Sequence, residues 1–409
     1  MKLTPKGMRD FSPEDMLIRE EVIGIIKQIF RSYGYKPLDT PVMEYLDTLR
    51  AKAGEEVDRQ IFVIEDKEYG LRFDLTVPLA RYAATHDEPK PFKRYAIEKV
   101  WRKEEPQRGR FREFYQADVD IVGSDSMRCE AEILSLAKDV CSAFGFKKPR
   151  IILNNRKILD GIAMKLNIED KKGEVFRVLD KLDKIGEKKV AGMLDEILGA
   201  KSKELLKIIK CKGTNVQRLK LAAEYSEEGA KELEEILSLC NFDIEIDLFL
   251  VRGLGYYTGP VYEVKLSDDI GTVIAGGRYD NLLHVYGQSA PATGISVGIE
   301  RLITLMSEKK KSVKKKTYTR LFIAAVKPEF YKDAIKIAAE FRNAGISCET
   351  DLNMRNLRKQ LNYANVLGIP YAAIIGEREI KEEKVTLKDM VSGKEESLKI
   401  KDVISMLTR

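Results

Sequence analysis

Residues 94–123, RYAIEKVWRKEEPQRGRFREFYQADVDIVG, predict two β-strands joined by a polar turn. The first strand leads to residues 101–104, residues 105–110 form the turn, and the second strand begins near Phe111. Side chains alternate across a strand, so one face of the second strand is apolar and the other carries a carboxamide and two carboxylates. The polar face consists of Phe114, Gln116, Asp118 and Asp120, and the apolar face of Tyr115, Ala117, Val119 and Ile121.

The polar face and the turn are together suited to a ligand. Arg102 and Arg110 stand at the two ends of the turn, and a guanidinium can hold a phosphate through two parallel hydrogen bonds. Gln116 and Asp120 can hold a small polar molecule. On these residues alone, a solvent-exposed sheet face without a ligand is an equally weighted alternative.

Two further stretches place arginine beside glycine. Residues 251–259, VRGLGYYTG, set Arg252 between an apolar strand and a glycine-rich turn. Burial of such a guanidinium is unfavourable without an anionic partner, so an anionic ligand and a structural salt bridge beside a hairpin are both open. In residues 275–280, AGGRYD, the paired glycines predict a turn or a close approach of two backbone segments.

Residues 294–302, GISVGIERL, predict a strand that runs into a helix. Arg301 lies in the first turn of that helix, where the positive end of the helix dipole disfavours a cation. A phosphate or a nucleotide ring beside Arg301 would explain this placement, and a surface salt bridge is the commoner explanation.

The chain has 409 residues, 44% of them hydrophobic and 33% charged, which is a globular composition with room for about two to three domains. The net charge is +6, and residues 308–320 alone contain seven basic residues and one acidic residue. The rest of the chain is therefore balanced, and a general basic surface for nucleic acid is not expected. We interpret the basic segment as a linker, with a dedicated binding patch as the alternative.

Cysteine and histidine usage argues against several kinds of site. The five cysteines are scattered without Cys-x-x-Cys spacing, unlike zinc ribbons or disulfide frameworks. His86 and His284 lie far apart, so a histidine metal site or a Ser-His-Asp triad is hard to build. The sequence shows no apolar signal core and no apolar run of membrane-spanning length, so we expect a cytoplasmic location and no membrane partner.

The expected elements change character along the chain. Ser12, followed by proline and acids, predicts the start of a helix that ends at Gly34. Strand-like segments dominate residues 72–123, and a helix is expected over 130–144. Residues 168–239 have helical spacing and few strand signals, which indicates a helical insertion. Strand patterns resume at residues 244–251, 256–266 and 272–275, and residues 321–375 alternate strands with helices as in a small α/β domain.

Together these stretches resemble the histidyl-tRNA synthetase family of class II aminoacyl-tRNA synthetases over nearly the whole chain. The opening GMRDF of residues 7–11 matches the family start, and FDLTVP of residues 73–78 matches one of its branches. Residues 252–259 and 275–280 resemble the two histidine-specific signatures. The helix to Gly34, with a strand containing Pro41, resembles the first class motif. Residues 100–123 resemble the second motif, and residues 294–302 the third.

The resemblance implies an α+β fold with a class II antiparallel-sheet catalytic core over residues 1–308, including a helical insertion at about 168–239. A lysine-rich linker over residues 309–320 and a C-terminal α/β anticodon-binding domain over residues 321–409 are expected to follow. The first class motif implies a homodimer. The implied substrates and partners are ATP with Mg²⁺, L-histidine and tRNA(His).

Residue by residue, the resemblance divides one pocket into an amino-acid side and a nucleotide side. On the amino-acid side, Asp74, Thr76 and Gln116 are implied to face the α-amino group, and Asp120, Tyr256 and Tyr257 the imidazole. On the nucleotide side, Arg102 is implied to hold the α-phosphate, Phe114 and Arg301 to sandwich the adenine, and Glu104 and Arg110 to lie along the nucleotide. Arg252 is implied to reach both the α-phosphate and the substrate carboxylate, so Arg252 and Arg102 are the expected catalytic residues. The family often has Asp where this chain has Gly255, so a contact through that side chain is not expected here.

The implied reaction is attack of the histidine carboxylate on the α-phosphorus of ATP, which gives histidyl-adenylate and pyrophosphate, followed by transfer of histidine to the 3′ end of tRNA. A carboxylate is already deprotonated, so the first step needs no general base. Negative charge grows on the phosphate in the transition state, and fixed guanidinium groups stabilise that charge.

Three other functions compete with this interpretation. A non-catalytic paralogue, such as the regulatory subunit of ATP phosphoribosyltransferase, typically lacks the anticodon-binding domain and some ATP-contacting residues, whereas both are expected here. A class II synthetase for proline, threonine or glycine is disfavoured by residues 252–259. A tRNA-binding regulatory module without turnover is the third alternative.

Overall fold

The computed structural model describes residues 4–50, 58–64, 68–106, 110–179, 185–211, 213–251, 256–267, 271–308 and 316–408. The chain divides into two compact units, one of residues 1–10 and 21–311 and the other of residues 11–20 and 312–409. The division after residue 311 falls inside the expected linker, of which residues 309–315 lie outside the described part of the chain. The divisions after residues 10 and 20 group the start of the first expected helix with the second unit.

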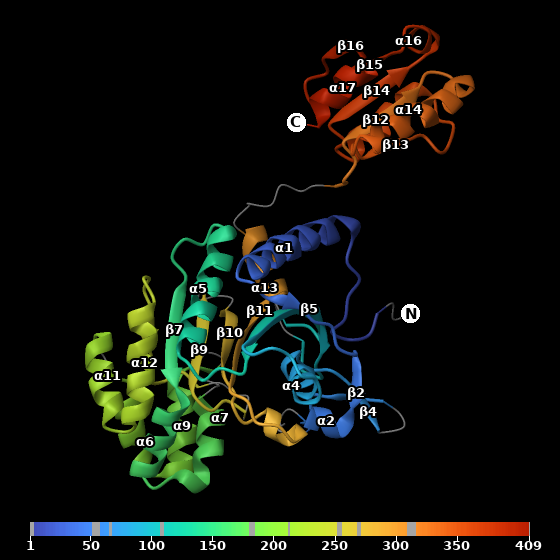
Figure 1. The fold of residues 1–409 in the computed structure, drawn as a ribbon. Coiled ribbons are helices and arrows are strands. Elements are labelled where there is room, and N and C mark those ends of the chain that lie inside the picture. The colour runs from blue at the N-terminus through green and yellow to red at the C-terminus, as the bar shows by residue number, and fades with distance from the viewer. Residues whose placement is uncertain are drawn as a thin grey trace. The chain divides into compact units, whose positions relative to one another are not determined.

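The first unit is built on an eight-stranded sheet with the order β1-β5-β6-β11-β10-β9-β7-β8 (Figure 1). Neighbouring strands are antiparallel from β5 to β7, and only the outermost pairs, β1 with β5 and β7 with β8, are parallel. The strands are β1 (Lys36–Pro37), β5 (Phe92–Trp101), β6 (Glu113–Val122), β7 (Arg150–Asn155), β8 (Glu245–Ile246), β9 (Pro260–Lys265), β10 (Thr272–Arg278) and β11 (Ala292–Gly298). A small sheet with the order β2-β4-β3 consists of β2 (Met43–Tyr45), β3 (Phe62–Val63) and β4 (Tyr69–Leu71). This mixture of antiparallel sheet and helices confirms the α+β class.

Helices flank the main sheet. The expected helices are present as α1 (Pro13–Ser32), in which the Ser12 hydroxyl accepts the backbone N–H of Asp15 at 3.1 Å, and as α5 (Arg128–Ala143). The remaining helices before the insertion are α2 (Leu46–Arg50), α4 (Thr76–Thr85) and α6 (Arg156–Lys165). Residues 168–239 are helical wherever they are described in regular structure, with η1 (Glu169–Lys171), α7 (Lys172–Leu179), α9 (Glu187–Leu198), α10 (Lys201–Ile209), α11 (Asn215–Ala223) and α12 (Glu227–Leu239). η2 (Leu283–Tyr286) and α13 (Ile299–Glu308) complete this unit.

One face of the main sheet is closed by α5. Arg278 of β10 forms a two-pronged ion pair with Glu130 of α5, in which Nε and Nη2 each lie 2.9 Å from a carboxylate oxygen. Both side chains are at most 3% exposed, so the pair lies between helix and sheet. Thr293 of β11 pairs with Arg278 in register and also hydrogen-bonds to Glu130, so it points the same way. The alternate residues of these strands point to the opposite face of the sheet.

Two local expectations need correction. Strands were expected to dominate residues 72–123, but α4 begins at Thr76. Asp74 Oδ1 accepts the backbone N–H of Val77 at 3.0 Å, and Pro78 in the first turn needs no N–H partner, so both residues favour a helix start that strand-like composition conceals. A strand is expected to contain Pro41, but this residue lies between β1 and β2.

The second unit contains a five-stranded sheet with the order β13-β12-β14-β15-β16. The expected elements are β12 (Leu321–Ala325), α14 (Tyr331–Asn343), β13 (Cys348–Thr350), α15 (Leu357–Val366) and β14 (Tyr371–Ile375), with η3 (Pro328–Phe330) before α14. The three strands are parallel, which fits their helical crossovers. The sequence interpretation stopped at residue 375, and the structure adds α16 (Glu377–Lys381), β15 (Lys384–Asp389), β16 (Glu395–Lys399) and α17 (Ile400–Leu407).

Candidate active site

A row of polar side chains crosses the sheet face opposite α5. Asp120 of β6 pairs in register with Arg94 of β5 and Gly294 of β11, and Asp118 pairs with Ala96 and Ser296. Gln116 pairs with Glu98 and Gly298. The alternation expected for this strand is therefore correct, and its polar face is buried, because Gln116, Asp118 and Asp120 are 9%, 2% and 2% exposed. We call Arg94, Gln116, Asp118, Asp120 and Ser296 the polar row.

Asp120 is held from two sides. Its Oδ2 lies 2.9 Å from Nη2 of Arg94, and its Oδ1 accepts the hydroxyl of Tyr279. Burial raises the pKa of Asp120, while Arg94 and the Tyr279 hydroxyl act in the opposite direction. A carboxylate fixed in this way is suited to accept a hydrogen bond from a ligand N–H.

Gln116 and Asp118 meet at one hydroxyl group. Nε2 of Gln116 donates to Ser296 Oγ at 2.7 Å, and the Ser296 hydroxyl also hydrogen-bonds to Asp118. Burial is the largest cause of a rise in the pKa of Asp118 to about 7.

Asp74, Thr76 and Tyr256 meet at the start of α4. The hydroxyl groups of Thr76 and Tyr256 hydrogen-bond to each other. Asp74 is 3% exposed, and burial raises its pKa to about 6 against the lowering effects of the Val77 N–H and of Arg102. Asp74 also acts electrostatically on Asp118, so the start of α4 adjoins the polar row. The two tyrosines of residues 256–257 are in ring contact, with centroids 4.9 Å apart.

Two glycines make room for these side chains. A Cβ on Gly277 would lie 2.8 Å from the Tyr257 ring, and one on Gly294 would lie 2.1 Å from Asp120 Oδ1. Both distances are too short for real carbon contacts, so the two positions require glycine. Of the two alternatives for the paired glycines, close approach is confirmed and a turn is wrong, because both lie within β10.

The nucleotide side begins at Arg102. Its Nε donates to the carbonyl oxygen of Phe73 at 2.8 Å, and its guanidinium carbon lies 5.2 Å from the centroid of the Phe114 ring. Further along the turn, Nη1 of Arg110 lies 3.7 Å from Oε2 of Glu104. Because Arg102 also stabilises the charge of Asp74, the residues expected to bind the nucleotide adjoin those expected to bind the amino acid.

Arg301 lies in the first turn of α13. The helix follows β11 directly, and Glu300 accepts the backbone N–H of Tyr115 at 3.2 Å, which fixes the helix start against β6. The Arg301 guanidinium donates to the carbonyl oxygen of Thr272. The structure thus places Arg301 in the first turn of a helix, as expected.

Several buried polar atoms of this site have no hydrogen-bond partner within the described part of the chain. They are Oδ2 of Asp74, Nε and Nη1 of Arg94, Oε1 of Gln116 and Oδ1 of Asp118. A buried polar atom without a partner is unfavourable by about 1–3 kcal/mol, so a cluster of them points to a ligand or to ordered water. The contacts above join eight of the twelve expected site residues: Asp74, Thr76, Arg102, Phe114, Gln116, Asp120, Tyr256 and Tyr257. Of the other four, Glu104 and Arg110 pair with each other, Arg301 contacts Thr272, and Arg252 lies outside the described residues.

Three members of the site were given no role from the sequence. Arg94 lies in a strand rich in apolar residues, and its pairing with Asp120 becomes visible only through the strand register. Tyr279 reaches Asp120 from the end of β10, and Ser296 reaches Gln116 from β11. The available signal was a polar residue among the apolar residues of each segment. The strand register, which decides which of these residues face one another, could not be predicted from the sequence.

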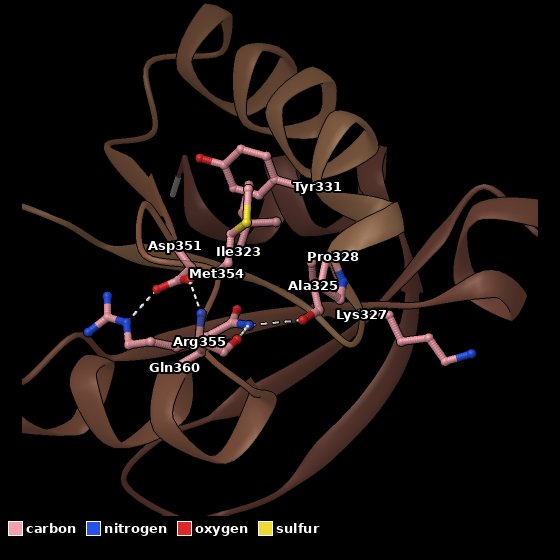
Figure 2. Close-up of a pocket in the computed structure, with 9 residues that line it drawn as sticks. All are labelled: Ile323, Ala325, Lys327, Pro328, Tyr331, Asp351, Met354, Arg355 and Gln360. Atoms are coloured by element: carbon pink, nitrogen blue, oxygen red, sulfur yellow. Dashed lines mark hydrogen bonds and ion pairs between the residues drawn. The ribbon is translucent and has the colours of Figure 1, made fainter.

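The second unit has a separate hollow at the end of its parallel strands (Figure 2). Arg355 pairs with Asp351 across its floor, and its guanidinium carbon lies 4.1 Å from the centroid of the Tyr363 ring. Nε2 of Gln360 donates to the carbonyl oxygen of Ala325 at 3.0 Å. The lining residues are Ile323, Ala325, Lys327, Pro328, Tyr331, Asp351, Met354, Arg355 and Gln360, which we call the C-terminal hollow.

Comparison with known proteins matches both units. Residues 7–302 match the family model for histidyl-tRNA synthetase, and residues 320–409 match the model for an anticodon-binding domain. The histidine–tRNA ligase of Korarchaeum cryptofilum is 40% identical over 98% of this chain and 97% of its own.

Two solved structures extend the comparison. The histidyl-tRNA synthetase of a Nostoc species is 30% identical, with a TM-score of 0.85 over 100% of this chain and 99% of its own. A Bacillus halodurans structure described as an ATP phosphoribosyltransferase regulatory subunit/histidyl-tRNA synthetase has a TM-score of 0.74 at 21% identity, over 89% of this chain and 96% of its own. At that identity it shares the fold, and the fold alone does not separate the two activities.

Proposed function

The chain belongs to the histidyl-tRNA synthetase family and acts as a histidine–tRNA ligase, and on that premise we propose how its site divides the work. The polar row and the start of α4 bind L-histidine, and the region around Arg102 and Phe114 binds ATP. The observation that carries this proposal is the cluster of buried, unpartnered polar atoms on Asp74, Gln116 and Asp118 in the described part of the chain, beside the fixed carboxylate of Asp120. Those atoms are suited to an α-ammonium group and an imidazole N–H.

On the amino-acid side, Asp74 and Gln116 supply oxygen acceptors for the α-ammonium group, and Thr76 and Tyr256 close the wall beside them. Asp120 accepts the imidazole N–H, and Tyr257 lies next to the ring. A site that hydrogen-bonds a ring N–H leaves its acceptor unpaired with any apolar analogue, which favours histidine by about 10⁴ or more without an editing domain.

On the nucleotide side, the adenine lies between Phe114 and Arg301, with Glu104 and Arg110 along the nucleotide. Arg102 and Arg252 hold the α-phosphate. When the histidine carboxylate attacks the α-phosphorus, the bond to pyrophosphate breaks and negative charge collects on the phosphate oxygens. The two guanidinium groups stabilise that charge more strongly in the transition state than in the ground state.

We also propose that Mg²⁺ reaches the site with the triphosphate. Mg²⁺ usually binds through phosphate oxygens, waters and one or two carboxylates, and Glu104 provides a carboxylate of that kind near Arg110. Bound there, the ion would neutralise phosphate charge. In the described part of the chain, no group of three or more Asp, Glu, His or Cys side chains is arranged to hold a metal ion.

The second unit is proposed to bind the anticodon region of tRNA(His). This rests on the anticodon-binding family match and on the C-terminal hollow, in which Arg355 lies over an aromatic ring and Lys327 adds a second cation to the lining. Aromatic and guanidinium planes stack on unpaired bases, as single-stranded RNA recognition requires. Domain boundaries at 308 and 321, with a linker between them, are part of this proposal.

A homodimer and a cytoplasmic location complete the proposal. Val42, Met43 and Tyr45 are 43%, 48% and 61% exposed in and beside β2, and such an apolar patch next to the first class motif is suited to a partner subunit. The scattered cysteines fit a reducing compartment. None of the described helices is long and apolar enough to cross a membrane.

The deciding experiment is amino-acid-dependent exchange of pyrophosphate into ATP, measured with each of the twenty amino acids. We expect exchange with histidine alone. Exchange with another amino acid would overturn the specificity, and no exchange with any of them would favour the non-catalytic regulatory alternative.

A further inference from the structure

Asp118 lies between two proposed histidine-binding residues, and no individual contact with the substrate has been assigned to it. It occupies β6 two positions from both Gln116 and Asp120, on the same face and 2% exposed. Its partner across the strand is Ser296 of β11. The carboxylate of Asp118 and the carboxamide of Gln116 both hydrogen-bond to the Ser296 hydroxyl, the latter through Nε2 at 2.7 Å.

When Asp118 is ionised, the chemistry of these three groups allows a single direction of hydrogen bonding. Above the raised pKa of Asp118, about 7, its carboxylate can only accept, so the one proton of the Ser296 hydroxyl points to Asp118. The serine oxygen is then left with lone pairs, and Gln116 must donate to it through its NH₂ group. The orientation of the Gln116 carboxamide therefore follows from the charge of Asp118, two hydrogen bonds away.

The same constraint fixes the position of the carbonyl oxygen of the Gln116 carboxamide. With Nε2 committed to Ser296, Oε1 of Gln116 is presented on its own, and it is buried without a partner in the described part of the chain. A carbonyl oxygen attracts an ammonium group, whereas an NH₂ group in its place would repel it. Resting on the proposed function, we propose that Asp118, acting through Ser296, is a positioning residue that holds the carbonyl of Gln116 toward the substrate's α-ammonium group.

The test is a double-mutant cycle on Ser296→Ala and Asp118→Asn, with the KM for histidine and the KM for ATP measured in pyrophosphate exchange at about pH 8, where Asp118 is largely ionised. The carboxamide introduced by Asp118→Asn can donate or accept, so it no longer imposes one direction on Ser296. Each single variant should raise the KM for histidine about tenfold, the scale of one hydrogen bond to a charged group. The double variant should be no worse than the more impaired single variant, because both changes break the same chain of contacts. The KM for ATP should stay unchanged.

Two matched variants serve as controls. Ser296→Thr keeps the hydroxyl and should retain the wild-type KM for histidine. Thr293→Val removes a hydroxyl from the other face of β11, where it meets Tyr262 at 2.8 Å, and should leave that KM unchanged even if the unfolding temperature falls. If Asp118→Asn fails to fold, the contrast between Ser296→Ala and Ser296→Thr still decides the matter.

Two outcomes would overturn the positioning role: an unchanged KM for histidine in Ser296→Ala, or single-variant effects that multiply in the double variant. If the wild-type protein shows histidine-dependent pyrophosphate exchange, either result rejects the positioning role of Asp118 and leaves the proposed function intact. A wild-type protein without histidine-dependent exchange would instead reject the proposed function itself.

Discussion

Arg94 of β5 and Asp120 of β6 form an ion pair inside the sheet, with Nη2 and Oδ2 2.9 Å apart and side chains 1% and 3% exposed. The same Nη2 donates to the carbonyl oxygen of Leu75 at 2.7 Å, directly before α4. The carboxylate proposed to recognise imidazole is therefore tied to the segment that carries Asp74 and Thr76. The guanidinium group of Arg94 therefore both positions the proposed imidazole acceptor and holds β5 against the segment before α4.

Removing that guanidinium should destabilise the protein strongly. Arg94→Met leaves the buried charge of Asp120 without its partner, and loss of one member of a buried pair is expected to lower the free energy of unfolding by about 3–5 kcal/mol. Denaturant unfolding measures this difference. Arg378→Met, at an exposed pair with Glu382, is the matched control and should change stability little. Equal losses in the two variants would contradict the framework role of Arg94.

Asp120→Asn should separate the two sides of the pocket. The variant keeps the shape of the side chain but removes the charge that accepts the imidazole N–H, so the KM for histidine should rise about 10- to 100-fold. The KM for ATP should not change. Pyrophosphate exchange at varied histidine and ATP measures both values. A rise confined to the KM for ATP would show that the pocket is divided differently.

Arg252→Ala should lower the kcat of adenylate formation by about 10²–10³, the scale for loss of one donor to a developing oxyanion. This prediction rests on the family signature at residues 252–259, because Arg252 lies outside the described residues. Rapid-quench measurement of the first turnover isolates the step. Activity close to that of the wild type would remove Arg252 from the mechanism, and Arg378→Ala serves as a surface control.

Asp118 should make stability depend on pH. Burial raises its pKa in the folded protein to about 7, from about 3.9 in the unfolded chain. Between those values the folded state holds a proton that the unfolded state has lost, so the free energy of unfolding should fall as pH rises from about 4 to about 7. Asp118→Asn lacks this term. Its stability relative to the wild type should therefore be greater at pH 8 than at pH 4.5, by an amount of the order of a few kcal/mol. Denaturant unfolding of both proteins at the two pH values tests the sign, and a constant difference would mean that Asp118 does not titrate in this range.

Arg355→Ala should weaken tRNA use without affecting amino-acid activation. It removes the guanidinium that lies between Asp351 and the Tyr363 ring in the C-terminal hollow, so the KM for tRNA in aminoacylation should rise, by about tenfold for one lost stacking contact. Histidine-dependent pyrophosphate exchange should match the wild type. Equal loss in both assays would point to misfolding, and loss in neither would exclude this hollow from tRNA binding.

Local patterns predicted much of this architecture because helix and strand periodicity depend on neighbouring residues. The helix after Ser12, the alternation around Gln116 and the α/β rhythm after Leu321 were all visible in this way. The start of α4 was missed, because the side chain that favours it, Asp74, belongs to a segment that otherwise has strand-like composition. The last strand of the second unit was not predicted, because β16 is mostly exposed and its residues, EESLK, lack the apolar alternation of a half-buried strand.

By itself, the sequence determined which residues are proposed to carry the chemistry, since arginine, carboxylate and paired tyrosine signatures are local and specific to a family. Only the tertiary structure decided which of those residues act together. Strand register sets Arg94 against Asp120 and Ser296 against Asp118, across separations of 26 and 178 positions in the chain. Such pairings follow from the packing of whole strands, in which a shift of one residue would turn every side chain to the opposite face.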